Sequence, residues 1–467
     1  MNLDYFKNKK ITLFGLGLHG GGVGIVNFLV KYGARVIVTD IKSKEQLAPS
    51  LEKLKGLKNV EYVLGQQRSE DFSKVDMVIK NPIVSWDNQH IKLALENKIP
   101  VEMDSSLFFK LCKNPIIGIT GTKGKTTTAM LIYEILKIAG KNPLKVGIGQ
   151  ASVLDKIDAL KKDSVVVFEL SSWRLSALGR ATMSPHIAVI TNILEDHLNF
   201  YKSTDDYVKD KKNIFLFQKP TDWLVINKQN DILEKISGEA KSKLFTFSLS
   251  GNGGNNSIYL DGEDICLNNG IDSKKIISLS DIKIPGKHNI QNVMAAIAAC
   301  FAFGIKPEEI KKAIVNFKVI PHRLELVREL KNIKYYNDTA ATIPDATISA
   351  LDCFSQPIVL IAGGEDKGLD FSKLAQKILT STKKTVFLKG SATNKLIEQI
   401  KKNLSEEERE KKTFEIFDSM EAAVIRASQL AESGDIVLLS PGAASFGLFL
   451  NEFDRGDKFK DAVGKLK

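Results

Sequence analysis

The segment IIGITGTKGKTTTAM, residues 116–130, carries the residue types that bind a phosphate group. After a β-branched run come a glycine-rich turn and then apolar residues at helical spacing; the turn and the residues after it are Gly121, Thr122, Lys123, Gly124, Lys125, Thr126 and Thr127. Backbone N–H groups at a helix start and a lysine attract phosphate oxygens, and a hydroxyl after the lysine can bind Mg²⁺. The first glycine, Gly121, lies closer to Gly124 and Lys125 than the general P-loop pattern requires. We predict a nucleotide-phosphate site on a strand–loop–helix unit; the alternative is a chance glycine turn before a helix.

Two other segments place metal-binding residue types just after predicted strands. Glu169 ends the run VVVFE, and His197 follows the apolar run at residues 186–191. The carboxyl ends of parallel strands form the edge at which α/β sheets bind ligands, and Mg²⁺ in nucleotide sites takes one or two carboxylates. Glu169 is therefore a candidate magnesium ligand and His197 a candidate metal or substrate contact. The alternatives are a helix N-terminal acid and a structural histidine.

A pair of asparagines opens an apolar helix pattern at residues 293–303. Side-chain amides at Asn289 and Asn292 could contact the edge of a nucleotide base. Helix capping by Asn289 explains the same residue equally well, because asparagine is among the preferred N-cap residues.

Two cationic residues have weak local signals. Arg323 follows Pro321 and His322 and could meet charge that develops on phosphate, but it could also be a surface arginine at a domain junction. Lys211 lies in a lysine-rich helix pattern at residues 205–215, and its local sequence predicts a solvated surface lysine.

A second glycine motif follows the first predicted strand, residues 11–14. Its glycines Gly15, Gly17 and Gly20 have the G-x-G-x-x-G spacing, and Asp40 ends the next strand. This is the dinucleotide-fold fingerprint, although UDP sugars can use the same turn. An NAD dehydrogenase is an alternative reading, but it leaves the phosphate-binding loop at residues 121–126 without a role. The uncharged stretch at residues 11–30 resembles a signal peptide or membrane anchor, yet its six glycines favour a strand and a turn.

Apolar strand-like runs alternate with helix-period segments along the chain, which predicts an α/β fold with largely parallel sheets. We expect three domains, at residues 1–111, 112–319 and 320–467. The turn-rich segment SLSGNGGNNS, residues 248–257, predicts a hairpin or an exposed loop. Further strands are expected at 34–39, 164–168, 186–191, 222–227, 334–337, 357–362, 385–388 and 435–440.

Composition excludes several classes. The 467 residues carry a net charge of +11, but the lysines are spread along the chain and no basic cluster alternates with aromatics, so nucleic-acid binding is not indicated. Hydrophobic content of 43% and charged content of 26% are ordinary for a globular protein. Four scattered cysteines without a C-x-x-C pair fit reduced thiols in a cytoplasm.

Taken together and in this order, the segments TGTKGKTTT, EDH, GKHNIQN and PHRLE resemble the Mur ligase family, the ATP-dependent ligases that build the peptidoglycan stem peptide. ELSSW, NDTAAT, GGEDK and LSPGAASF, which begin at residues 169, 337, 363 and 439, resemble segments of its D-glutamate-adding branch. The resemblance covers essentially the whole chain. It implies a Rossmann-like N-terminal domain for uridine diphosphate, a central P-loop-type ATP domain and a Rossmann-like C-terminal domain for the amino acid.

The activity that the resemblance implies is ATP-dependent addition of D-glutamate to UDP-N-acetylmuramoyl-L-alanine through an acyl phosphate, in cytoplasmic peptidoglycan precursor synthesis. The resemblance implies a monomer that binds ATP, two Mg²⁺ ions and these small-molecule substrates. It implies no binding of nucleic acid or of a membrane. A ligase of the same fold that uses L-glutamate or another amino acid, and a non-catalytic nucleotide-binding relative, remain alternatives.

The resemblance also implies roles for single residues. Lys125 and Thr126 would hold the ATP phosphates and a magnesium ion, and Glu169 and His197 would bind magnesium. Lys211 would be carbamylated and would organise the second metal site. The nucleotide would further contact Asn289, Asn292, Arg323 and Asp338. Substrate contacts would come from Gly15, Gly17, Asp40 and Lys42 for the UDP, from Thr342, Lys367, Ser445 and Phe446 for the glutamate, and from Ser171.

The chain departs from the family pattern at four places. Gly147-Ile148-Gly149 stands where many members have Gly-Asn-Ile-Gly, so an asparagine contact to the muramoyl substrate is missing. Ala340 replaces a lysine, Arg174 replaces a glutamine, and Glu452 stands near an aromatic position of the glutamate pocket. These departures bear on the acceptor and the amino acid and leave the phosphate-binding residues untouched.

Overall fold

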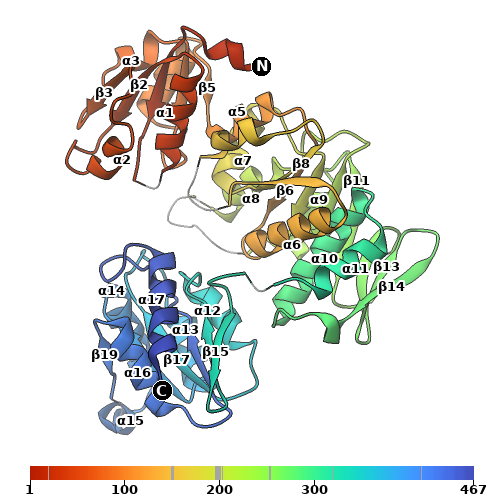
Figure 1. Cartoon of the computed structure of the whole chain (residues 1–467), viewed down its shortest axis with the longest axis vertical. Coiled ribbons are helices and arrows are strands. Elements are labelled where there is room, and N and C mark those ends of the chain that lie inside the picture. The colour runs from red at the N-terminus through yellow and green to blue at the C-terminus, as the bar shows by residue number, and fades with distance from the viewer. Residues whose placement is uncertain are drawn as a thin grey trace. The chain divides into compact units, whose positions relative to one another are not determined.

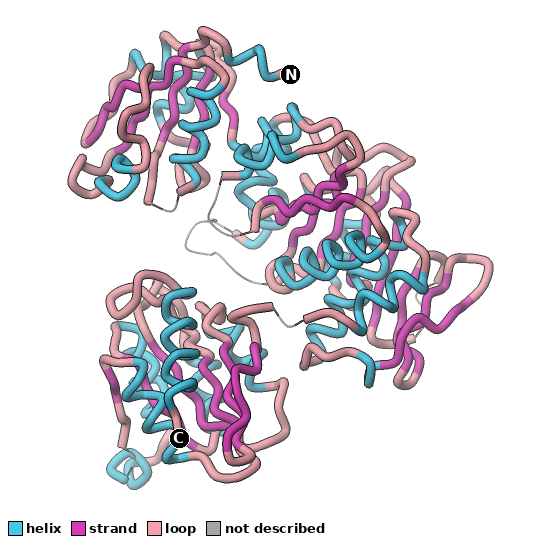
Figure 2. Tube along the Cα trace, in the orientation of Figure 1, coloured by secondary structure: helices cyan, strands magenta, loops and turns pink. Residues whose placement is uncertain are grey.

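The computed structural model describes the chain apart from residues 19, 149–151, 195–200, 202, 252–253, 319 and 412. The described residues divide into two compact units. The first contains residues 1–281 and 291–316, and the second contains residues 282–290 and 317–467. In both units helices flank β-sheets, which is the predicted α/β class (Figure 1, Figure 2).

The first sheet of unit 1 has five parallel strands in the order β3-β2-β1-β4-β5. They are β1 (Lys10–Phe14), β2 (Arg35–Asp40), β3 (Val60–Leu64), β4 (Met77–Lys80) and β5 (Val101–Glu102). The strand order reverses between β1 and β4, so their carboxyl ends open a crevice of the kind that binds nucleotides in doubly wound folds. The accompanying helices are α1 (Gly21–Lys31), α2 (Ala48–Glu52), α3 (Glu70–Ser73) and α4 (Gln89–Glu96).

The second sheet of unit 1 has nine strands in the order β14-β13-β12-β11-β10-β9-β6-β8-β7. The strands that lie between the edge strand β7 and β12 in this order, β6 included, all pair in parallel. β13 and β14 extend the sheet beyond β12 in antiparallel pairing. Strand residues such as Val166 and Ile190 are fully buried because helices cover both faces. The strands are β6 (Ile116–Thr120), β7 (Asn142–Val146), β8 (Ser164–Glu169), β9 (Ile187–Ile190), β10 (Trp223–Asn227), β11 (Lys243–Ser248), β12 (Ser257–Asp261), β13 (Asp264–Asn268) and β14 (Ser273–Ser278).

Helices around this sheet position the predicted phosphate loop. α6 begins directly after the loop and packs against α11, as the adjacent ribbons in Figure 1 show. The helices are α5 (Asp104–Leu111), α6 (Lys125–Ile138), α7 (Ser172–Arg180), α8 (Thr204–Lys212), α9 (Asp231–Ser237), α10 (Lys287–Ala302) and α11 (Pro307–Val315).

The two edges of the nine-stranded sheet have distinctive residues. Edge strand β7 contains Pro143, which has no N–H to donate, and Lys145. The opposite edge strand, β14, exposes the consecutive lysines Lys274 and Lys275.

Segment 248–257 connects β11 to β12, which are parallel, so the segment is a loop and not a hairpin. The hairpin lies one strand later, where β12 turns into antiparallel β13.

Unit 2 contains a six-stranded sheet in the order β15-β16-β20-β17-β18-β19. Only the pair β15–β16 is antiparallel, and apolar clusters fill both faces. The strands are β15 (Glu325–Leu330), β16 (Ile333–Asn337), β17 (Ile358–Gly363), β18 (Lys384–Leu388), β19 (Ile416–Phe417) and β20 (Ile436–Leu439). The helices are α12 (Pro344–Leu351), α13 (Ser372–Ser381), α14 (Ser391–Lys402), α15 (Glu406–Lys411), α16 (Met420–Leu430) and α17 (Glu452–Lys465).

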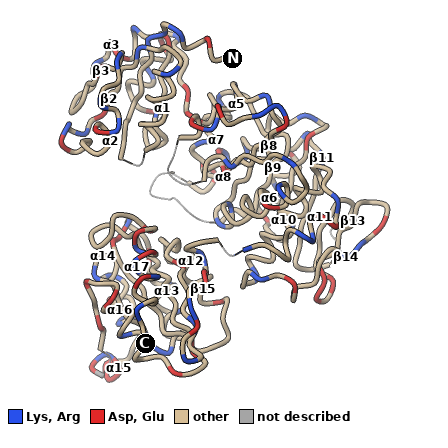
Figure 3. Tube along the Cα trace, viewed as in Figure 1, with Lys and Arg blue, Asp and Glu red and all other residues tan. Residues whose placement is uncertain are grey.

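Charged residues of both signs are interspersed along the trace of each unit (Figure 3). This distribution agrees with the reading of the positive net charge as dispersed lysines rather than one basic tract. Within the described part of the chain, no helix combines the length and the apolar character that crossing a membrane requires.

Candidate active site

The loop at residues 121–124 joins β6 to α6 and has a tightly constrained backbone. Gly124 is the N-cap of α6 with a φ of +84°, and a Cβ there would lie 2.1 Å from Asn292 Oδ1. A Cβ at Gly121 would lie 1.9 Å from Thr191 Oγ1. Only glycine fits where a side chain presses on the backbone in this way. The loop therefore ends in an α-helix N-terminus with little room to rearrange, which is the backbone arrangement that binds phosphate.

The side chains of Lys125 and Thr126 follow this loop in the first turn of α6. Lys125 Nζ donates to the carbonyl oxygens of Gly121 and Thr122 at 2.9 and 3.0 Å. Thr126 Oγ1 donates to Glu169 Oε2 at 2.8 Å. The contact arises because β8 pairs with β6 in parallel register, with Ile119 opposite Glu169. Two oxygen groups, a hydroxyl and a carboxylate, thus stand together beside the loop.

Lys211 is buried, with a relative exposure of 1%. Its Nζ donates to Gly121 O at 3.0 Å and to Thr120 Oγ1 at 3.4 Å, and it lies 4.6 Å from the centre of the Tyr207 ring. The local prediction of a solvated surface lysine is wrong, because α8 turns this residue toward the phosphate loop while the neighbouring lysines of the same pattern remain more exposed.

Three residues that hold the loop were not singled out from the sequence. Asn192 accepts a hydrogen bond from Lys123 N at 2.9 Å through Oδ1, and its Nδ2 donates to Lys123 O at 3.1 Å. Thr191 Oγ1 also donates to Lys123 O, and the Tyr207 hydroxyl lies 3.2 Å from Thr122 Oγ1. The available signal was the position of Thr191 and Asn192 just after a strand adjacent to β6. His197, six residues beyond Thr191, lies outside the described residues.

The predicted asparagine pair is divided between the two units. Asn292 is buried in unit 1, where its Oδ1 accepts from Thr128 Oγ1 at 3.4 Å beside Gly124. Asn289 belongs to unit 2, and its Nδ2 donates to Pro285 O at 2.6 Å. Of the two, the structure brings Asn292 to the phosphate loop.

A second candidate binding surface lies at the carboxyl edge of the five-stranded sheet. The Asp40 carboxylate accepts hydrogen bonds from Leu16 N and Gly17 N at 2.9 and 3.2 Å, and from Lys42 N at 3.0 Å. Asp40 therefore shapes the glycine turn itself. Three apolar side chains are exposed just beyond β1, β2 and β4 at this edge, and they are Leu18, Ile41 and Ile83. Such a surface suits the flat apolar face of a base or sugar.

Unit 2 gathers the predicted polar residues at the carboxyl ends of β16, β17 and β20. Asp338 is buried, and its carboxylate accepts from Ser440 Oγ at 2.8 Å and from Leu324 N at 3.2 Å. Burial raises the pKa of Asp338 to about 7, while these hydrogen bonds and the charge of Arg323 lower it. Arg323 itself is exposed.

The predicted amino-acid residues lie at the same edge of this sheet. Ser445 is buried, and Phe446 is half-exposed with its ring centre 6.0 Å from Lys367 Nζ. Thr342 N donates to Ala340 O in the loop after β16. The loops that follow β17 and β20 pair with each other through Glu365 and Ala444.

Arg455 in α17 connects these loops and was missed by the sequence reasoning. It is fully buried, and its guanidinium donates to Thr339 Oγ1 at 2.9 Å, to Thr339 O at 3.0 Å and to Ala443 O at 3.1 Å. Burial lowers the pKa of Arg455 to about 10. An arginine in an amphipathic C-terminal helix gives no local sign of burial, so only the fold reveals this contact.

The departures from the family pattern have structural partners. Arg174 donates to Gly147 O at 3.2 Å and pairs with Asp104 at 3.4 Å, so it stabilises the segment in which the asparagine is missing. The preceding N-cap, Ser171, accepts from Arg174 N and begins α7. In unit 2, Ala340 N donates to His322 O at 3.1 Å, and the Glu452 carbonyl accepts from Thr339 Oγ1 at 2.8 Å.

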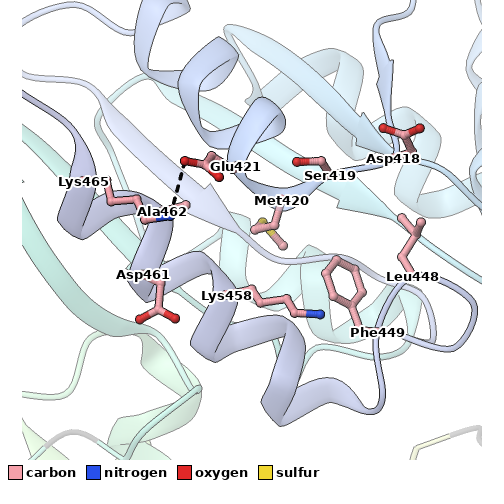
Figure 4. Close-up of a pocket in the computed structure, with 10 residues that line it drawn as sticks. All are labelled: Asp418, Ser419, Met420, Glu421, Leu448, Phe449, Lys458, Asp461, Ala462 and Lys465. Atoms are coloured by element: carbon pink, nitrogen blue, oxygen red, sulfur yellow. Dashed lines mark hydrogen bonds and ion pairs between the residues drawn. The ribbon is translucent and has the colours of Figure 1, made fainter.

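A cavity of about 310 Å³ opens elsewhere in unit 2, between α16 and α17 (Figure 4). Lys458 extends toward the Phe449 ring, and Lys465 pairs with Glu421 at 3.4 Å. None of the residues predicted to bind nucleotide or substrate lines it. This cavity is therefore separate from the strand-end loops of unit 2 that contain the predicted residues.

Family models match three consecutive parts of the chain. Residues 9–102 match the Mur ligase MurD-like N-terminal domain, and residues 119–300 match the Mur ligase middle domain. Residues 322–442 match the domain described as Mur ligase, glutamate ligase domain.

Similar curated proteins extend over the whole chain. A UDP-N-acetylmuramoylalanine–D-glutamate ligase of Roseiflexus sp. (strain RS-1) is 38% identical over 462 residues, which cover 97% of this chain and 98% of that protein. A ligase of the same name from Borreliella afzelii (strain PKo) is 39% identical over 481 residues and covers 100% of both chains.

Solved structures show the same fold at low identity. The UDP-N-acetylmuramate-alanine ligase MurC of Thermotoga maritima superposes with a TM-score of 0.60 at 20% identity, covering 98% of this chain and 100% of that chain. MurF of Acinetobacter baumannii superposes with a TM-score of 0.61 at 16% identity, covering 99% and 92%.

Proposed function

The chain belongs to the Mur ligase family, and from this premise we propose that it is a UDP-N-acetylmuramoylalanine–D-glutamate ligase, a member of the MurD branch. It is an ATP-dependent amide ligase of peptidoglycan precursor synthesis. The observation that carries the proposal is the pairing of Thr126 with Glu169 beside the loop at residues 121–124, in a chain that matches ligases of this name over its full length. That site suits phosphoryl transfer from ATP.

The residues around the loop fit a magnesium ion. Mg²⁺ prefers hard oxygen ligands and usually takes one or two carboxylates together with phosphate oxygens, which matches the hydroxyl of Thr126 and the carboxylate of Glu169. A second ion would involve His197 and Lys211, whose amine would have to be carbamylated to supply oxygen ligands. When bound, magnesium would neutralise negative charge on the phosphates.

The reaction begins with an unreactive group, because a carboxylate is a poor electrophile. The terminal phosphoryl group of ATP passes to an oxygen of the alanyl carboxylate, forming an acyl phosphate and ADP. The amine of D-glutamate then attacks the acyl carbon, the amide bond forms, and inorganic phosphate leaves. Bringing a carboxylate to a triphosphate opposes like charges, and the cations Lys125 and Arg323 would offset this repulsion.

The substrates divide between the two units. The UDP group of the acceptor would lie at the glycine turn of the five-stranded sheet, near Gly15, Gly17, Asp40 and Lys42, where the exposed side chain of Ile41 can face the base. D-Glutamate would contact Thr342, Lys367, Ser445 and Phe446. We expect the enzyme to act as a monomer in the cytoplasm, where ATP is available.

The test is phosphate release from ATP with Mg²⁺ and UDP-N-acetylmuramoyl-L-alanine, comparing D-glutamate, L-glutamate and L-lysine. Release that requires both the acceptor and D-glutamate is expected. Lys125→Ala should abolish it, whereas Lys137→Ala, at the exposed end of the same helix α6, should leave it unchanged. Release with a different amino acid would move the specificity within the fold, and release with none would refute the ligase proposal.

A further inference from the structure

Lys80 ends β4 and is buried, with a relative exposure of 2%. Its Nζ donates to Val84 O at 2.8 Å and to Asn81 O at 3.4 Å, and it lies 4.6 Å from the centre of the Trp86 ring. No carboxylate in the described part of the chain forms an ion pair with this ammonium group. Its polar partners are the backbone carbonyls of the loop that follows it.

A lysine in this position is costly to keep. Burial, followed by the charge of Arg180 in α7, lowers the pKa of Lys80 to about 7, while the charges of Asp104 and Asp210 raise it. An apolar residue of similar size would avoid this cost, since a buried charge contributes less to stability than well-packed hydrophobic atoms. What the ammonium provides instead is a fixed conformation for residues 81–84.

That loop packs directly on the glycine turn after β1. Asn81 Nδ2 donates to Gly15 O at 3.3 Å, and Asn81 N donates to Phe14 O at 2.9 Å. A Cβ at Gly15, whose φ is +93°, would lie 2.9 Å from Asn81 Cβ. The position of Asn81 therefore fixes the shape of the turn that Asp40 holds from the other side.

The far end of the segment is anchored on α7. Trp86 Nε1 donates to Ser176 Oγ at 2.9 Å, and the Arg180 guanidinium lies 4.2 Å from the centre of the indole ring. The indole thus has two cations near its ring, Lys80 and Arg180. With both ends held, residues 81–84 have little freedom to move away from the glycine turn.

We propose that Lys80 is a positioning residue for the nucleotide-sugar substrate: its ammonium group fixes residues 81–84, and through Asn81 the glycine turn, in the shape that binds the nucleoside diphosphate. The inference rests on the proposed function, which places the UDP group at this turn. Lys80 does not contact the reacting atoms, so its effect belongs to binding of the acceptor and not to phosphoryl transfer.

The test compares Lys80→Met with Lys74→Met, a change of an exposed lysine just before β4. Loss of preorganisation and of a charged hydrogen-bond donor should raise the KM for UDP-N-acetylmuramoyl-L-alanine about tenfold to a hundredfold. The KM for ATP and the kcat at saturating acceptor should stay within about twofold of the wild type, since the phosphate loop is untouched. Lys74→Met should match the wild type in all three constants.

Calorimetric binding of UDP alone separates this inference from the proposed function. A weaker UDP Kd for Lys80→Met supports the positioning role even if the wild type turns over a different acceptor. An unchanged UDP Kd and acceptor KM, or equal losses in every constant, would overturn it. If Lys80→Met does not fold, hydrogen exchange on the wild type decides: UDP should slow exchange at residues 81–86, and an unaltered rate there would overturn the inference.

Discussion

Replacing Arg455 by methionine tests whether one buried cation holds the loops of the proposed amino-acid site together. Methionine keeps most of the side-chain volume and removes the three hydrogen bonds to Thr339 and Ala443. Two of the acceptors are backbone carbonyls, and a buried acceptor left without a donor costs about 1–3 kcal/mol. Removing a costly buried charge offsets part of this loss.

The net loss should be about 2–4 kcal/mol, which corresponds to a factor of about 30 to 1,000 in the population of the ordered loops. The loops concerned follow β16 and β20, and they contain Thr342, Ser445 and Phe446. We therefore expect the KM for D-glutamate to rise at least about tenfold, while the KM values for ATP and for the nucleotide-sugar substrate change little.

The assay is steady-state phosphate release with each substrate varied in turn. Arg426→Met is the matched control, because Arg426 in α16 of the same unit forms a partly exposed ion pair with Glu415, and such exposed pairs contribute little to stability. Hydrogen exchange at residues 338–343 and 441–447 would show the loosening directly. A folded Arg455→Met enzyme with the wild-type KM for D-glutamate and unchanged exchange would refute the reasoning.

Two further predictions concern carboxylates. Glu169→Gln keeps the size of the side chain and an acceptor for Thr126 but removes the charge. We therefore expect kcat/KM to fall about a hundredfold or more, and the Mg²⁺ concentration that gives the half-maximal rate to rise. A magnesium titration equal to that of the control Glu134→Gln would contradict the metal assignment. Asp338 has a folded pKa of about 7, above the ordinary carboxyl value, so the folded state binds its proton more tightly and stability is lost as pH rises from about 4 to about 7. Asp338→Asn should lack this loss, which is at most about 4 kcal/mol, and thermal unfolding from pH 5 to 8 should show the wild type falling relative to the variant; parallel curves would be the contrary result.

Strand positions followed from sequence because buried parallel strands are nearly continuous apolar runs. The segment 164–168 was predicted as a strand and is β8 (Ser164–Glu169), and 357–362 is β17 (Ile358–Gly363). The pairing partner of a strand was harder to predict. The composition of segment 248–257 predicted a hairpin or an exposed loop, and the parallel pairing of β11 and β12 excludes the hairpin. Composition alone could not decide, because pairing depends on the arrangement of the whole sheet.

Side-chain environment was predictable only where a motif fixes the backbone. The glycine–lysine–threonine segment determines its own loop, so Lys125 and Thr126 could be placed at a helix N-terminus in advance. Lys211 and Arg455 lie in charged helices whose local sequence predicts solvent, and their burial is set by the surrounding fold. Asp40 illustrates a third case: its spacing predicted a ligand contact, and the structure shows a carboxylate that organises the turn.

The edge strands of the nine-stranded sheet affect how readily this protein aggregates at high concentration. An edge strand exposes unpaired N–H and C=O groups and can recruit another chain into intermolecular β-structure. On β7, Pro143 removes one donor from that edge. On β14, Lys274 and Lys275 form ion pairs with Asp272 and Asp264, and another chain would have to desolvate these charged groups in order to pair with the edge. Replacing these lysines with valine or threonine would keep the strand pairings of the sheet. The uncharged edge could then pair with other chains, so fibrillar aggregation would become more favourable.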